Sequence, residues 1–76
     1  MSDLDPADLL AFEAQWWQHA GAKERAIWDT FGLSATRYYQ VLNLYIGTPA
    51  AVQQDPITTR RLLGAQSRAR SWRLAG

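Results

Sequence analysis

Apolar residues recur every three to four positions along most of the chain, which is the spacing that places them on one face of an α-helix. No stretch alternates apolar and polar residues as a half-buried strand would, and no internal repeat or low-complexity tract is present. In the first helical stretch the apolar residues fall within an arc of about 160° at about 100° per residue. They are Leu9, Leu10, Phe12, Trp16, Trp17 and Ala20. The pattern predicts an all-α protein.

Proline, glycine and capping residues divide this pattern into separate helices. Asp5-Pro6 predicts the start of a first helix over residues 5–20, and Gly21 is the expected residue after its end. Residues 23–46 form the next unit, in which Gly32 separates two helices and Ser34 caps the second.

Two further proline signals follow. Thr48-Pro49 opens a turn or a short helix, and Asp55-Pro56 begins a basic C-terminal helix over residues 55–73. We therefore expect one domain over residues 1–76, built as a small helix-turn-helix three-helix bundle with an additional C-terminal helix.

The segment around Gly32 has the rhythm of a helix-turn-helix. Gly32 permits the turn, Leu33 points inward, and the buried side continues into the next helix. The bulky Trp28 occupies a position where many such motifs have a small residue, so it either widens the helix crossing or lies outward against the first helix or the C-terminal helix. The expected core comprises Phe12, Trp16, Ile27, Phe31, Leu33, Tyr38, Val41, Leu42 and Tyr45.

The helix after Ser34 has one polar face. With Tyr38 at the centre of the inner face, Tyr39 lies at its rim, and Leu44 falls on a far flank. The residues expected to contact DNA are Thr36, Gln40 and Asn43, with Arg37 and Tyr39 at the flanks. Their hydroxyl, amide and guanidinium groups can hydrogen-bond to base edges or phosphates. A plain three-helix bundle can show the same pattern without binding DNA.

The charge distribution adds a second basic element. Residues 1–38 sum to −3 and residues 39–76 sum to +4, although the net charge is only +1. We expect Arg60, Arg61 and Arg68 to contact phosphates, unless the tail is an ordinary solvated helix face. An apolar stripe at Leu62, Ala65, Ala69 and Trp72 predicts packing onto the domain or onto a second subunit, as in a homodimer.

Catalytic and metal chemistry are not expected. His19 is the sole histidine and cysteine is absent, so we expect no metal site and no disulfide. Glu13 falls inside the apolar arc and needs a partner, for which Arg25, Arg37 or a backbone N–H are candidates. Phosphate-binding and hydrolase motifs are absent. We expect a non-enzymatic protein without a cofactor, without a membrane span, and located in the cytoplasm.

Two runs carry a family resemblance: "FEAQWW" at residues 12–17 and "AGAKERAIWDTFGLSATRYYQVLNLYI" at residues 20–46. The chain resembles a family of small actinobacterial and actinophage helix-turn-helix proteins, a domain of unknown function. The resemblance covers about residues 11–46, and "SATRYY" is its most specific part. It implies a helix-turn-helix and no catalytic residues.

Two functions follow as expectations. The first is a sequence-specific transcriptional regulator that binds double-stranded DNA through the helix at residues 34–46. The alternative is a protein-interaction module that uses the same bundle to bind a protein of the transcription machinery or another protein partner.

Overall fold

The structure is a computed structural model that describes residues 4–15 and 20–75, with the side chains of residues 4–15 and 21–67. Its described residues form five α-helices and contain no strand, which confirms the all-α class. The helices are α1 (Pro6–Ala14), α2 (Ala20–Phe31), α3 (Ala35–Ile46), α4 (Pro49–Gln54) and α5 (Pro56–Ala75).

The expected capping residues begin these helices. The Asp5 carboxylate accepts the Ala7 N–H at 3.0 Å, and the Ser34 hydroxyl accepts the Arg37 N–H at 3.2 Å. Thr48-Pro49 opens a helix rather than a turn, so α4 is a separate short element. The Asp55 carboxylate accepts the N–H of Thr58 at 3.0 Å, and this bond holds the pKa of Asp55 below its ordinary value.

The prediction that the first helix continues to residue 20 is wrong. It ends at Ala14, where Gln15 adopts an extended backbone, and α2 already begins at Ala20. Gly21 therefore lies inside α2 instead of terminating the helix before it. Two hydrogen bonds close the end of α1: the Gln15 N–H donates to the Phe12 carbonyl at 3.1 Å, and the Arg61 guanidinium donates to the Glu13 carbonyl at 2.8 Å from far along the chain.

The core lies where α1, α2, α3 and α4 meet. Its buried apolar members are Leu9, Leu10, Phe12, Ile27, Tyr38, Leu42, Ile46 and Ala51. Phe31 is partly buried and its ring lies 5.4 Å from the ring of Phe12. Of the other predicted core residues, Leu33, Val41 and Tyr45 pack against this cluster with partial burial, and Trp16 lies outside the described residues.

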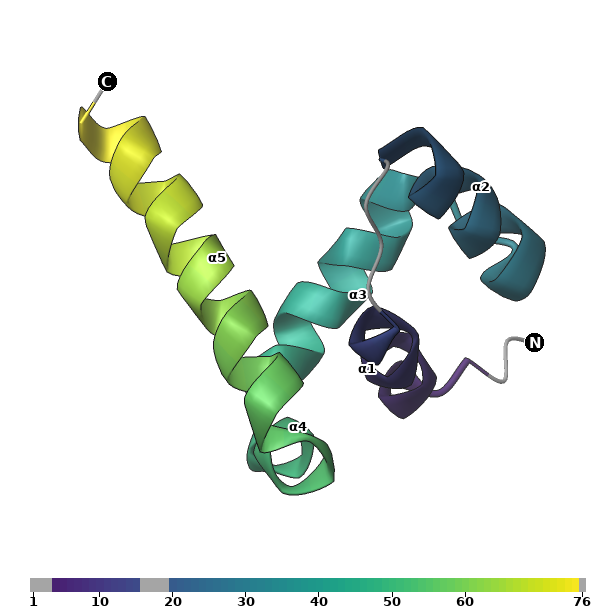
Figure 1. Ribbon diagram of the computed structural model, residues 1–76, viewed down its shortest axis with the longest axis horizontal. Helices are drawn as coiled ribbons and strands as arrows, with labels where there is room; N and C mark the ends of the chain where they lie inside the picture. The colour runs from purple at the N-terminus through teal and green to yellow at the C-terminus, as the bar shows by residue number, and fades with distance from the viewer. Residues whose placement is uncertain (1–3, 16–19, 76) are drawn as a thin grey trace.

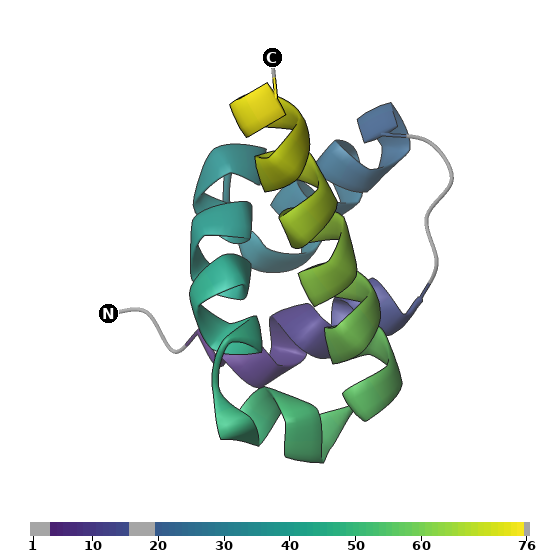
Figure 2. The same ribbon diagram turned by 90° about the vertical axis from the view of Figure 1, so that its left-hand side faces the viewer.

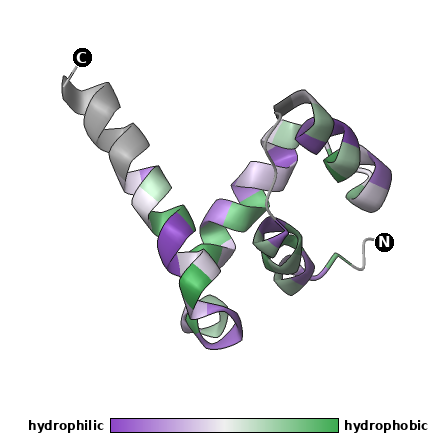
Figure 3. Ribbon diagram, viewed as in Figure 1, coloured by the Kyte–Doolittle hydropathy of each residue, from purple (hydrophilic) through white to green (hydrophobic). Residues whose placement is uncertain are grey.

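The last two helices close one end of the bundle. The buried Thr59 hydroxyl donates to the Ala51 carbonyl at 3.0 Å, and the Gln54 amide donates to the Ala7 carbonyl at 2.8 Å. Figure 1 shows α3 and α5 diverging from α4 like the arms of a V, and Figure 2 shows α1 crossing behind them. In Figure 3 hydrophobic positions gather where α3 and the start of α5 converge. The far part of α5 therefore projects from the body.

Candidate nucleic-acid interface

The junction between α2 and α3 is a tight turn built on one glycine. Gly32 has a φ of 68°, a left-handed conformation that costs other L-residues energy. Its N–H donates to the Trp28 carbonyl at 2.8 Å and so closes α2, and Ser34 caps α3 two residues later. Trp28 lies outward, with 61% of its surface exposed. The turn thus leads α3 away from α2 within three residues.

The phase of α3 is set by Tyr38, Leu42 and Ile46, which are buried. Successive residues are rotated by about 100° around the helix axis, so the mean direction of these three side chains defines the inward side. The opposite, outward direction lies within about 20° of both Gln40 and Leu44. Val41 and Tyr45, which the sequence pattern also placed inward, are only partly buried. Leu44 therefore lies at the centre of the outward face and not on its flank.

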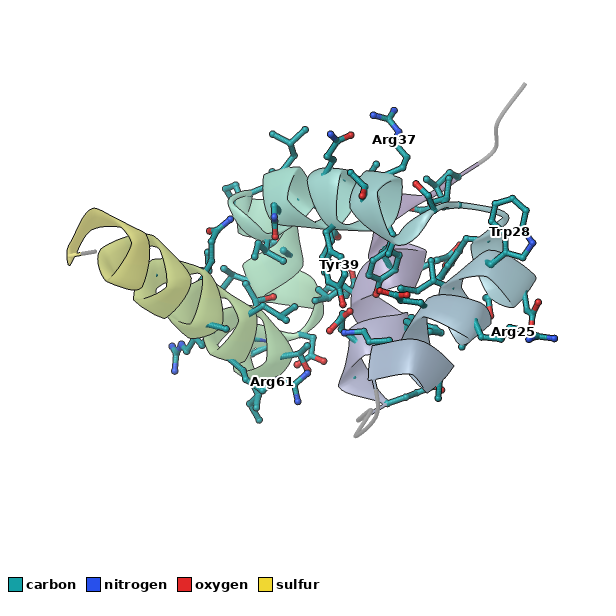
Figure 4. All side chains as sticks on the ribbon, turned by 90° about the horizontal axis from the view of Figure 1, so that it is seen from above. Arg25, Trp28, Arg37, Tyr39 and Arg61 are labelled. Atoms are coloured by element: carbon teal, nitrogen blue, oxygen red, sulfur yellow. The ribbon has the colours of Figure 1, made fainter. Side chains whose placement is uncertain are left out.

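The predicted DNA-contacting residues of α3 are all exposed. Thr36 and Asn43 lie on one side of Gln40, and Arg37 lies on the other. The Arg37 guanidinium donates to the side-chain carbonyl oxygen of Gln40 at 3.4 Å. Figure 4 shows Arg37 pointing away from the body of the molecule. The outward face thus combines a cation, a hydroxyl and two amides.

Tyr39 is not part of that outward face. Its ring packs edge-on against Tyr38 with centroids 5.0 Å apart, and the Lys23 ammonium lies 5.1 Å from its centroid. In Figure 4 it points toward the side of the molecule opposite to Arg37. The structure therefore separates Tyr39 from the other four α3 residues that the sequence grouped with it.

A buried polar cluster holds α1, α2 and α3 together behind this face. Glu13 is only 4% exposed, and its two carboxylate oxygens lie 3.0 and 2.8 Å from the Lys23 ammonium nitrogen. The Tyr38 hydroxyl donates to the same carboxylate at 2.5 Å. Neither Arg25 nor Arg37, the expected partners, is used, because Arg25 lies 3.8 Å from Asp29 and Arg37 bonds to Gln40.

The cluster perturbs both of its proton donors. Burial of the Tyr38 hydroxyl, followed by its hydrogen bond to Glu13, raises the pKa of Tyr38 well above the ordinary range of a phenol. Burial by itself would lower the pKa of Lys23, but its interactions with Glu13 and Tyr39 outweigh burial and raise it. At neutral pH the cluster therefore contains an ammonium and an un-ionised phenol. Sequence reasoning missed Lys23, since nothing local indicates that residues 13 and 23 meet.

The basic residues of α5 differ in their surroundings. Arg60 is exposed, whereas Arg61 is tied to the Glu13 carbonyl, and the side chain of Arg68 lies outside the described residues. Figure 4 shows Arg61 and Arg37 pointing to opposite sides of the molecule. The structure therefore does not bring Arg61 onto the surface that α3 presents.

A shallow apolar groove of about 300 Å³ runs beside the outward face of α3. It is lined by Pro6, Arg37, Val41, Leu44, Tyr45 and Thr48. Sequence reasoning missed this groove, because Pro6 comes from α1 and the remaining residues come from α3 and the turn that follows it. The apolar lining and the cation at one end form a surface that a second macromolecule can contact.

The described residues offer little for other chemistry. In residues 4–15 and 20–75, no group of three His, Cys, Asp or Glu side chains is arranged to hold a metal ion. His19 lies outside the described residues. Within the same ranges no helix combines the length and the apolar character that a membrane span requires.

Comparison with known proteins identifies a family for this chain but no relative with an assigned activity. A family model described as "Protein of unknown function (DUF3263)" matches residues 1–74. No curated protein and no solved structure matches the chain significantly. The match covers all five helices almost to the end of α5.

Proposed function

The chain belongs to the DUF3263 family, which has no assigned function, and we propose from its own surface that it is a sequence-specific DNA-binding transcriptional regulator. In this proposal α2, the Gly32 turn and α3 act as a helix-turn-helix, with α3 as the recognition helix. One observation carries the proposal: α3 is anchored by three buried residues and leaves Thr36, Gln40 and Asn43 exposed.

The chemistry of that face suits a major groove. An α-helix fits the groove, and glutamine or asparagine can bond in a bidentate manner to adenine. The hydrogen bond from Arg37 leaves the Gln40 amide nitrogen free to donate to a base, because it uses only the carbonyl oxygen. Arg37 itself can bind a phosphate or a guanine.

The buried cluster supports the same role by holding the recognition helix in place. Glu13 joins α1 to α2 through Lys23 and to α3 through Tyr38, so the three helices share one polar anchor. A rigid scaffold behind a binding face reduces the entropy lost on binding. Arg60 and Arg68 then add phosphate attraction without sequence preference.

A homodimer would supply the second half-site that a small recognition unit needs. Support comes from the projection of α5 away from the body in Figure 1. Leu62 packs within its own chain, so the dimer contact would begin beyond it. The other predicted stripe residues include Ala69 and Trp72, whose side chains lie outside the described residues. Sedimentation velocity should give a dimer mass, and a monomer at high micromolar concentration would remove this part of the proposal. Such a regulator would work in the cytoplasm, where the DNA is.

The protein-interaction alternative is favoured by one specific observation, the apolar groove beside Leu44. A groove of that kind can receive an apolar side chain from a partner helix. Under this alternative the protein would bind the transcription machinery or another protein through α3, and duplex DNA would bind weakly and without sequence preference.

The two functions are separated by selection from a random duplex library, followed by binding assays with variants. Gln40→Ala should weaken binding to the selected site by about 1–3 kcal/mol and leave random DNA almost unchanged. Gln53→Ala, which removes an exposed glutamine from α4, is the matched control and should bind as the wild type does.

Arg60→Ala tests the non-specific contribution. It should weaken binding to both selected and random DNA and reduce the salt slope by about one unit. If the library yields no enriched sequence, or if Gln40→Ala binds the selected site as well as Gln53→Ala does, α3 is not the recognition helix.

A further inference from the structure

Leu44 is the one large apolar residue at the centre of α3's outward face, as far as the described side chains extend. It is 79% exposed, although leucine is costly to leave in water. It stands one helical turn after Gln40, so the two side chains are neighbours on the surface. The sequence pattern places it on a flank, because that pattern counts Val41 and Tyr45 as inward, whereas both are only partly buried.

We infer that Leu44 is a specificity-determining residue, which contacts the methyl group of a thymine close to the adenine that Gln40 reads. This inference rests on the proposed function. Thymine is the one base that presents a methyl group in the major groove, and apolar side chains recognise it by contact. Leu44 would therefore add preference for A·T pairs that hydrogen bonds alone do not give.

The spacing of the two residues fits neighbouring base pairs. Positions four apart on a helix are separated by about 6 Å along its axis, whereas successive base pairs are about 3.4 Å apart. Gln40 and Leu44 thus span one or two base-pair steps when α3 lies along the groove. The predicted half-site contains an adenine and a thymine methyl group within that distance.

The charge around Leu44 favours DNA over a protein as the occupant. Arg37 lies about two turns before it on the same face, and both residues line the same groove. Thr36 and Asn43 border the face on its other side, and no acidic residue occurs anywhere in α3. A cation, hydrogen-bonding groups and one apolar contact are the combination with which helices read a major groove.

The test removes only the methyl group. In the site selected from a random library, each thymine is replaced in turn by deoxyuridine, which keeps the base pairing. At one position the wild type should lose affinity by about fourfold, the factor expected for one buried methyl-sized group. Leu44→Ala should bind the unmodified site more weakly and lose nothing further on that replacement. Ile57→Ala, which truncates an 80% exposed residue of α5, should retain the wild-type loss.

The outcomes distinguish the inference from the function beneath it. If an enriched site is found but no replacement affects the wild type, or if Leu44→Ala shows the same loss as the wild type, the inference is wrong and the DNA-binding function stands. If no site is enriched, both are wrong. In that case Leu44 and the groove beside it belong to a protein-binding surface.

Discussion

Replacing Lys23 by methionine tests the buried cluster most sharply, because it removes the cation and keeps much of the apolar side chain. The Lys23 ammonium lies 3.0 and 2.8 Å from the two oxygens of a carboxylate that is 4% exposed. Removing one partner of a buried ion pair costs about 3–5 kcal/mol, because the remaining charge is left uncompensated. We expect the lower end, about 3 kcal/mol, since the Lys23 side chain is 18% exposed and Tyr38 still donates to Glu13.

That loss is large for a domain of this size. At about 0.05–0.15 kcal/mol per residue, 76 residues give a total stability of about 4–11 kcal/mol. Urea denaturation followed by circular dichroism should therefore show a much lower midpoint for Lys23→Met with an unchanged slope. Combining it with Glu13→Gln removes the uncompensated charge and should restore more than about 1 kcal/mol.

The matched control is Arg25→Met, which removes a cation from the exposed face of the same helix. Arg25 is 83% exposed and lies 3.8 Å from Asp29, so its loss should cost less than about 1 kcal/mol. The reasoning is refuted if Lys23→Met costs no more than Arg25→Met. It is also refuted if the double variant is as unstable as Lys23→Met alone.

The remaining predictions concern the turn, the α4–α5 contact and alkaline pH. Gly32→Ala should cost about 1–2 kcal/mol because of its positive φ, whereas Gly21→Ala should be neutral or stabilising; equal thermal melts for the two would contradict this. Thr59→Val removes the hydroxyl that donates to the Ala51 carbonyl, which still accepts the Asp55 N–H, and should cost about 0.5–1.5 kcal/mol in urea; an unchanged midpoint would show that the bond contributes nothing. Because the fold raises the pKa of both Lys23 and Tyr38, their contribution is complete below the unfolded pKa values of about 10 and declines at higher pH. The free energy of unfolding should therefore be lower at pH 11 than at pH 8, and an equal value at both would contradict the cluster as described.

The starts of α1, α3 and α5 could be predicted from the sequence because their signals are local, whereas α2 begins at Ala20 and not at the expected residue 23. Asp5, Ser34 and Asp55 each bond to an N–H two or three residues later, next to a proline or at the start of an apolar pattern. The end of α1 could not be predicted in this way, since Arg61 reaches it from a position 48 residues away. Apolar periodicity alone therefore predicts a first helix that is too long.

The candidate site was predictable in composition but not in orientation. The residue types of α3 indicated a polar face, and Tyr38 was correctly placed in the core. The rotation of α3 differs from the pattern because Val41 and Tyr45, which are apolar enough to be expected inward, are only partly buried by the elements that pack against α3. The partner of Glu13 likewise depends on how the chain returns from α1 to α2, so Lys23 could not be identified from spacing.

The central claim, that α3 reads DNA, is tested most directly by nuclear magnetic resonance of ¹⁵N-labelled protein during titration with a duplex selected from a random library. The account predicts that the largest shifts occur at the backbone amides from Thr36 to Leu44 and at the side-chain amides of Gln40 and Asn43. Shifts confined to α2, or to α4 and α5, with α3 unchanged, would contradict it.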